Sequence, residues 1–117
     1  MLDFQLPPGL IDGDPPHWFA VVSPDRPLSL PPGDSGHPAA AEGAEPRVLI
    51  LEPGGEDDAF LSRYDSGLGY ITDEWHPTRE AAIEGATAEF GDELGPWSPI
   101  PEGEDPELFV RRSLRQQ

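Results

Sequence analysis

The sequence predicts an α+β domain: a small antiparallel sheet of three to four strands, with one main helix packed on one face and a short C-terminal helix. Three observations lead to this class. Residues 47–52 (RVLILE) are an apolar run of strand length, and residues 59–65 and 70–76 are strand-like segments around a short glycine-containing loop. Residues 78–90 then place apolar side chains at helical spacing.

A chain of 117 residues is expected to form a single domain over residues 1–117. Prolines prevent regular structure in residues 5–16, so we expect residues 1–16 to be an irregular N-terminal lead-in. Residues 31–46 contain no apolar residue larger than alanine and cannot bury enough surface to offset their ordering. We therefore expect a flexible loop rich in Pro, Gly and Ala at residues 31–46.

The strands are predicted from β-branched and aromatic residues between turn signals. Residues 17–23 (HWFAVVS) end at a proline-containing turn, and residues 28–30 could return as a short partner strand. The run at residues 47–52 is typical of a strand covered on both faces or placed centrally. Segments 59–65 and 70–76 form a β-hairpin, in which alternation puts Phe60, Ser62 and Tyr64 on one face of the first strand.

Two helices follow the hairpin. The main helix, residues 78–90, has Thr78 as its N-cap, Gly91 just past its end, and an apolar stripe of small residues and Phe90. After it, Trp97 is expected to fold back on the core. A second helix begins at Asp105, followed by proline at the first helical position, and has its arginines near the C-terminus.

The chain is strongly acidic: 23 Asp and Glu residues stand against 7 basic residues, all of them arginine, for a formal net charge of -16. Residues 52–107 carry -14 of this charge, residues 1–51 carry -5, and the last ten residues carry +3. A field of this kind speeds encounter with a positively charged partner. It opposes direct binding to nucleic acid, because Lys and Arg supply the affinity for phosphates.

The composition also argues against several kinds of chemistry. Without cysteine the chain has no disulfide framework, no thiol nucleophile and no thiolate metal site. No serine-histidine-aspartate order, phosphate-binding glycine loop or lysine is present, so we predict a protein that is not an enzyme and uses no cofactor. The N-terminus has neither a basic start nor a long apolar run, so we expect no membrane contact and a cytoplasmic location.

The densest polar segment is residues 73–76 (DEWH). Alternation along a strand puts Asp73 and His76 on opposite faces, while Glu74 and His76 share one and could ligate a metal. Because this pair lacks a recognised ligand spacing, we predict no metal site. The simpler interpretation is that His76 helps to end the strand before Pro77 and that Trp75 belongs to the core.

Acids and aromatic residues on regular elements are the candidates for partner binding. Interface hot spots favour aromatic side chains over acids, although we expect most of Trp18, Tyr64, Tyr70, Trp75 and Trp97 inside. Acidic side chains at Glu74, Glu80, Glu84 and Glu89 could be presented rigidly, and for each of them the alternative is a solvated face. The predicted partner-binding residues are Asp57, Asp58, Tyr64, Tyr70, Glu74, Glu80 and Glu84.

Residues 70–90, a strand ending in DEWH followed by a helix beginning PTREAA, resemble a pattern of short uncharacterised bacterial proteins. The following LGPW, residues 94–97, with residues 99–102, is similar to the same group, so that the resemblance covers about 35 residues. It implies a strand end, a helix cap and a core tryptophan, and it implies no activity. In size and charge the chain also resembles small acidic immunity proteins and antitoxins.

These observations favour an acidic protein-binding module that neutralises or regulates a basic partner protein, most plausibly an immunity protein or antitoxin that covers a toxin. One alternative is a DNA-mimic inhibitor of a nucleic-acid-binding protein. A second is a small metal-dependent hydrolase that uses Glu74, His76 and hairpin acids. A third is an accessory domain whose acidity serves solubility alone, and the oligomeric state stays open.

Overall fold

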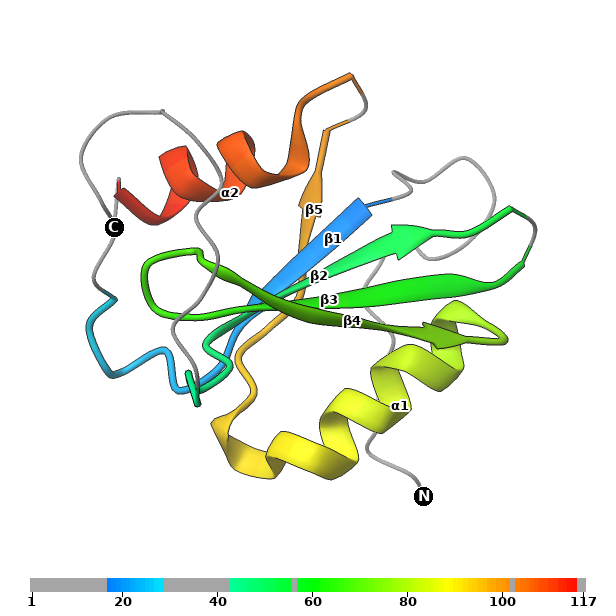
Figure 1. Ribbon diagram of the computed structural model, residues 1–117, viewed down its shortest axis with the longest axis horizontal. Helices are drawn as coiled ribbons and strands as arrows, with labels where there is room; N and C mark the ends of the chain where they lie inside the picture. Colours follow the sequence, from blue (N-terminus) through cyan, green and yellow to red (C-terminus); the bar gives the residue numbers. More distant parts are fainter. Residues whose placement is uncertain (1–16, 29–42, 56, 102, 116–117) are drawn as a thin grey trace.

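The computed structural model describes residues 17–28, 43–55, 57–101 and 103–115, and it confirms the α+β class. One five-stranded antiparallel sheet lies between two helices, α1 on one face and α2 on the other (Figure 1). The elements are β1 (His17–Val21), β2 (Val48–Pro53), β3 (Ala59–Tyr64), β4 (Tyr70–His76), α1 (Arg79–Phe90), the 3-10 turn η1 (Gly91–Glu93), β5 (Ser98–Ile100) and α2 (Pro106–Arg115).

The strand order is β4-β3-β2-β1-β5, so that β2, β3 and β4 form a meander and β1 lies between β2 and β5. The apolar run in β2 follows from its central place in the sheet. Leu49 and Leu51 face the α1 side, Val48 and Ile50 face the α2 side, and all four are fully buried. The prediction of a strand covered on both faces is therefore confirmed.

The sheet has one strand more than the three to four that the sequence predicts, because β5 adds a fifth. Its three residues lie in the Pro-rich connection after α1, and Ile100 pairs with His17 of β1. Pro99 lacks a backbone donor, which an edge strand tolerates. Leu28 is not part of a strand, whereas residues 29–30, the lead-in at residues 1–16 and most of the predicted loop at residues 31–46 lie outside the described residues.

Helix α1 forms one half of the core, and its predicted ends are confirmed. The Thr78 side chain accepts a hydrogen bond from the Ala81 backbone N–H, and Gly91 ends the helix with a φ of 55°. Ala82, Ile83 and Ala86 are buried against the sheet, next to Leu61 of β3. Trp97 and Phe90 pack against the same cluster, as predicted.

Helix α2 is the short C-terminal helix that the sequence predicts, and it covers the opposite face of the sheet. Its predicted start is confirmed, because Asp105 Oδ1 accepts a hydrogen bond from Leu108 N at 3.1 Å. Val110 and Leu114, four residues apart, are buried with Ile50 and Ile100 of the sheet. The arginines between them hide this short stripe in the sequence.

Candidate functional site

The β3–β4 hairpin presents three large aromatic side chains to solvent, Phe60 and Trp75 at its open end and Tyr70 next to its turn. Phe60, Tyr70 and Trp75 are 36%, 41% and 57% exposed, and the first and last are cross-strand partners. Strand alternation places Phe60, Asp73 and Trp75 on the α2 side of the sheet, and Tyr70 joins that side because the register shifts next to Tyr64, its partner on β3. We call the surface formed by Phe60, Tyr70, Asp73 and Trp75 the aromatic face.

Two sequence-based expectations are corrected here. Trp75 is not a core residue, since more than half of it is exposed. Tyr64, predicted to contact a partner, is only 4% exposed and packs in the α2-side core. Its ring makes an edge contact with the Tyr70 ring, with centroids 5.9 Å apart and planes at 73°. Tyr64 is therefore a core residue that contacts Tyr70, and it does not belong to the aromatic face.

The Trp75 side chain is held in place by the turn between β2 and β3. Its Nε1 donates a hydrogen bond to Asp58 Oδ2 at 2.7 Å. The turn is closed by Gly54 N–H donating to the Asp58 carbonyl at 2.8 Å, and a Cβ at Gly54 would overlap the Asp58 carboxylate. An open hollow of about 350 Å³ next to the indole is lined by Gly55, Asp57, Asp58, Trp75 and Pro77.

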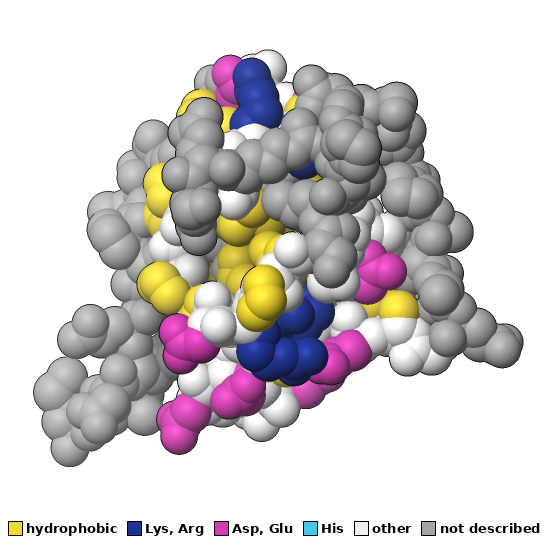
Figure 2. Space-filling view, turned by 90° about the vertical axis from the view of Figure 1, so that its left-hand side faces the viewer, with side chains coloured by type: hydrophobic (Ala, Val, Ile, Leu, Met, Phe, Trp, Pro, Cys, Tyr) yellow, Lys and Arg dark blue, Asp and Glu magenta, His cyan; other side chains and the backbone are white. Residues whose placement is uncertain are grey.

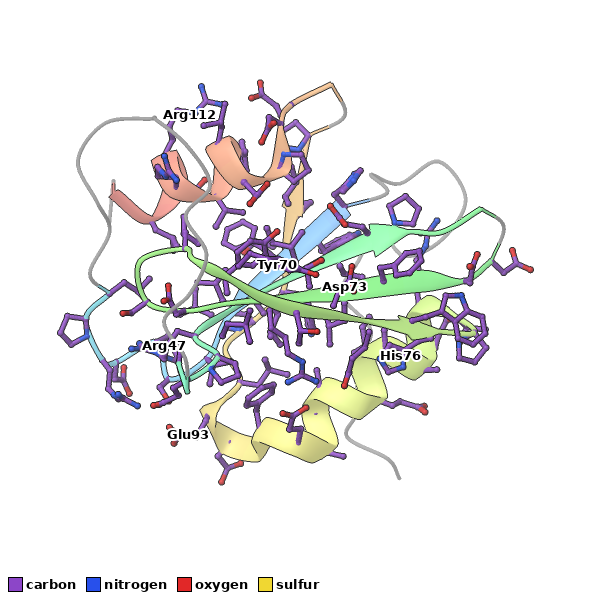
Figure 3. All side chains as sticks on the ribbon, viewed as in Figure 1. Arg47, Tyr70, Asp73, His76, Glu93 and Arg112 are labelled. Atoms are coloured by element: carbon purple, nitrogen blue, oxygen red, sulfur yellow. The ribbon has the colours of Figure 1, made fainter. Side chains whose placement is uncertain are left out.

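Carboxylates border the aromatic face and raise the pKa of neighbouring groups. The pKa of Glu52 in β2 is raised by partial burial and then by the nearby charges of Glu107 and Asp73. The pKa of Tyr70 is raised by a little burial and by Asp73. Tyr70 and Asp73 lie on the side of β4 that faces α2 (Figure 3). The potential over the aromatic face is therefore negative.

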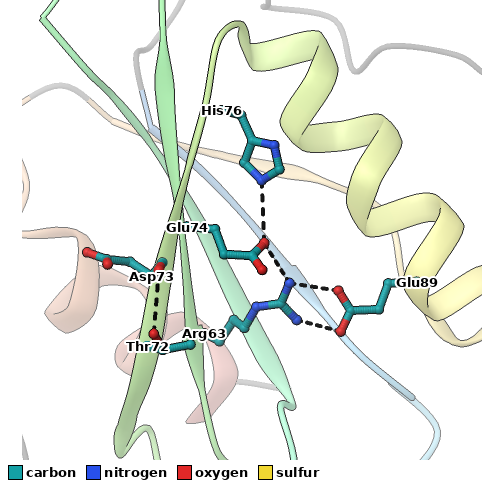
Figure 4. A network of polar contacts seen from close by, with 6 residues as sticks. All are labelled: Arg63, Thr72, Asp73, Glu74, His76 and Glu89. Atoms are coloured by element: carbon teal, nitrogen blue, oxygen red, sulfur yellow. Dashed lines mark hydrogen bonds and ion pairs between the residues drawn. The ribbon is translucent and has the colours of Figure 1, made fainter.

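The opposite side of β4 carries a different arrangement, centred on buried Arg63 (Figure 4). The Arg63 guanidinium donates to both carboxylate oxygens of Glu89 on α1, at 2.6 and 2.7 Å, and to Glu74 Oε1 at 2.8 Å. It also lies 5.7 Å from the centroid of the Phe90 ring. Hydrogen bonding from Arg63 lowers the pKa of Glu74, and the bonds to Glu89 raise the pKa of Arg63.

The predicted partner-binding residues consequently divide between two surfaces. Asp57, Asp58 and Tyr70 lie in or beside the aromatic face and the hollow at Trp75. Glu74 lies on the α1 side in contact with Arg63, while Glu80 and Glu84 are exposed on α1. Sequence reasoning missed Phe60 and Asp73 as members of this surface. Pairing the two hairpin strands residue by residue would have joined them to Trp75, but Tyr70 reaches the same face only through the register shift next to Tyr64.

The acids of β4 and α1 do not form a continuous row of free carboxylates, because Arg63 pairs with two of them. Of the four acids that the sequence suggests could be presented rigidly, Glu74 and Glu89 pair with Arg63. Glu80 and Glu84 are exposed on α1. Glu74 and His76 do share a face, with Oε1 and Nε2 3.4 Å apart, but that oxygen already accepts from Arg63. Within the described ranges, no three His, Asp or Glu side chains group to hold a metal ion.

Three other arginines also contact acceptors of this chain. Arg47 is buried, and its guanidinium donates to the carbonyls of Val22, Ser23 and Arg26 at 2.8 to 3.0 Å. At the surface Arg26 pairs with Glu45, and Arg112 pairs with Glu104. Figure 2 shows basic side chains next to acidic ones on this side of the molecule. The aromatic face has no arginine among its own residues.

In the part of the chain that the structure describes, no helix has the length and apolar character needed to cross a bilayer. A comparison of the chain with protein-family models, curated proteins and solved structures finds no match to any of them. A functional proposal for this chain therefore depends on the geometry of the aromatic face, its acidic border and the hollow at Trp75.

Proposed function

We propose that this protein is an acidic protein-binding module that binds a basic partner protein through the aromatic face. The observation that carries the proposal is the joint exposure of Phe60, Tyr70 and Trp75 beside Asp73. Large aromatic side chains dominate the affinity of protein interfaces. Phe60 and Trp75 place two of them side by side across the hairpin. The carboxylates around them favour a positively charged partner.

A second copy of the chain fits this surface less well than a basic partner. Strand β4 lies at the edge of the sheet and carries Asp73 and Glu74 in its middle. Antiparallel pairing of two β4 edges would bring these like charges together, which charged edge strands use to prevent self-association. With a net charge of -16 on each copy, the long-range repulsion acts in the same direction.

The proposal is tested by capture with the tagged full chain from native cell extract, comparing wild type with Trp75→Ser. A protein retained by wild type and lost from the variant is identified by mass spectrometry, produced separately and titrated calorimetrically. We expect a partner with positive net charge, at least tenfold weaker binding by Trp75→Ser, and slower association at higher salt. Glu84→Gln on α1 is the matched control and should bind like wild type.

Neutralisation of the partner, as by an immunity protein or antitoxin, is the form of regulation that we propose. Co-expression tests this step, because growth arrest caused by the partner should be relieved by the wild-type chain and not by Trp75→Ser. The proposal fails if wild type and Trp75→Ser retain the same proteins, or if the protein lost from the variant is acidic.

A further inference from the structure

We propose that the hollow beside Trp75 is a binding site for an arginine side chain. As a feature of the partner this rests on the proposed function, because a basic protein is the source of the arginine. The site itself is built from this chain alone. It combines one exposed indole with the carboxylates of Asp57 and Asp58, between the β2–β3 turn and the end of β4.

The indole is fixed before any ligand arrives. Its Nε1 donates to Asp58 Oδ2 at 2.7 Å, so the plane of the ring is set by a residue of the neighbouring turn. That turn is closed by the Gly54–Asp58 backbone hydrogen bond, and the Asp58 carboxylate occupies the space that a side chain at position 54 would fill. A ring held in this way loses little conformational freedom on binding.

The chemistry of the hollow fits a guanidinium better than other cations. A planar guanidinium stacks on the exposed face of tryptophan while its N–H groups donate to carboxylates at the rim. The exposed carboxylate of Asp57 lies at that rim. A methylated ammonium is instead recognised by a cage of several aromatic rings, and Trp75 is the single aromatic residue among the described residues that line the hollow.

Phe60 offers apolar surface for the methylene stem of the bound arginine. Phe60 lies directly opposite Trp75 on β3 and is exposed, so it extends the apolar surface beside the indole. The methylene stem of an arginine covers apolar surface of this kind while its head remains hydrogen-bonded. The occupant is therefore an arginine at the surface of a protein or in an extended peptide.

The test is an NMR titration of the full chain with the capped tripeptide Gly-Arg-Gly, followed through the three indole N–H signals. The Trp75 signal is identified by its absence in Trp75→Phe. We expect this signal to shift saturably while that of Trp97, packed in the α1-side core, does not move. Matched tripeptides with lysine or with citrulline, the neutral isostere of arginine, should bind at least about fivefold more weakly.

Two charge variants locate the site. Asp57→Asn is expected to weaken the arginine tripeptide about fivefold, whereas Asp92→Asn, which removes the same charge in η1 beyond the other end of α1, should leave it unchanged. The proposal is overturned if the Trp75 signal does not saturate, if citrulline or lysine binds as well as arginine, or if both variants act alike. Capture of a basic partner together with any of these results would reject the arginine site and leave the proposed function standing.

Discussion

Arg63 shows how a single residue links the hairpin to the helix. It is buried in β3, yet it pairs with two carboxylates that are each nearly half exposed, one on β4 and one on α1. Burial of the guanidinium is tolerated because three carboxylate oxygens accept its hydrogen bonds and the face of the Phe90 ring lies 5.7 Å away. Ion pairs thereby hold the α1 side of the hairpin to the helix, while the aromatic side chains on its α2 side stay exposed.

Replacing this arginine should cost stability in a pH-dependent way. Arg63→Gln is expected to lower the free energy of unfolding by about 2 kcal/mol at pH 7, less than for a fully buried pair because the glutamates reach solvent. The lowered pKa of Glu74 means that its contribution is present above the ordinary value of 4.5 and is lost as pH falls through the folded-state pKa. The difference from wild type in urea unfolding should therefore narrow from pH 7 to pH 3.

Arg26→Gln is the control for this prediction, since it breaks the exposed pair with Glu45 and should change stability by less than about 0.5 kcal/mol. An Arg63→Gln deficit that is the same at pH 7 and pH 3 would show that packing on Phe90, and not the ion pairs, carries the contribution of Arg63.

At the scale of elements, one glycine inside α1 and one directly after it have opposite roles. Gly85 lies inside the helix, where a Cβ would make an ordinary contact with the His76 ring at 3.5 Å. Gly91 ends the helix at φ 55° and ψ -129°, a conformation that is nearly restricted to glycine, with no atom near the position of its absent Cβ. The first glycine only weakens the helix, whereas the second is required by its end.

Alanine at these two positions should shift stability in opposite directions. Gly85→Ala is expected to raise the free energy of unfolding by about 0.5 to 1 kcal/mol through helix propensity. Gly91→Ala is expected to lower it by about 1 to 2 kcal/mol through backbone strain alone. Thermal unfolding monitored by circular dichroism measures both. If Gly85→Ala lowers the free energy of unfolding instead, the new Cβ collides with the His76 ring and does not make the ordinary 3.5 Å contact.

The elements that the sequence predicts well are those whose signals are local. The Thr78 cap, the Gly91 end and the doubly buried run in β2 need only neighbouring residues, and each is found as expected. Strand β5 depends on pairing with β1, more than 70 residues earlier, and three residues containing a proline carry no strand pattern. The expectations fail where a distant contact decides the structure.

The same reason explains the misplaced aromatic residues. A strand pattern gives the alternation of side chains but not which part of a sheet face a helix covers. Because α2 packs over the end of the sheet near Tyr64 and Ile100, Tyr64 is buried while Trp75, farther along the hairpin on the same side, stays exposed. In the turn, Leu68 adopts a φ of 62°, although glycines flank it, because its side chain is buried in that core.

For the whole molecule, the distribution of charge matters more than its total. The buried charged side chains among the described residues are Arg47, Arg63 and Arg111, and every described Asp and Glu reaches solvent at least in part. Three of the six arginines whose side chains are described are thus buried, whereas the acids lie at the surface. With a formal net charge of -16, this acidic surface repels itself.

Salt should therefore stabilise this protein. The described fold has principal extents of 40 × 31 × 26 Å, comparable to the Debye length of about 30 Å at 10 mM salt, so that nearly all surface acids repel one another. At 500 mM NaCl the screening length is only about 4 Å, while the largely buried contacts of Arg63 are screened much less. We expect the melting temperature to rise by about 5 °C between these conditions, corresponding to roughly 1 kcal/mol.

The control is the triple variant Glu80→Gln, Glu84→Gln, Asp92→Asn, which removes exposed acids outside the aromatic face. Its melting temperature should be higher than that of wild type at about 10 mM salt and should rise less with added salt. A melting temperature that falls with salt would mean that attraction between surface pairs outweighs self-repulsion.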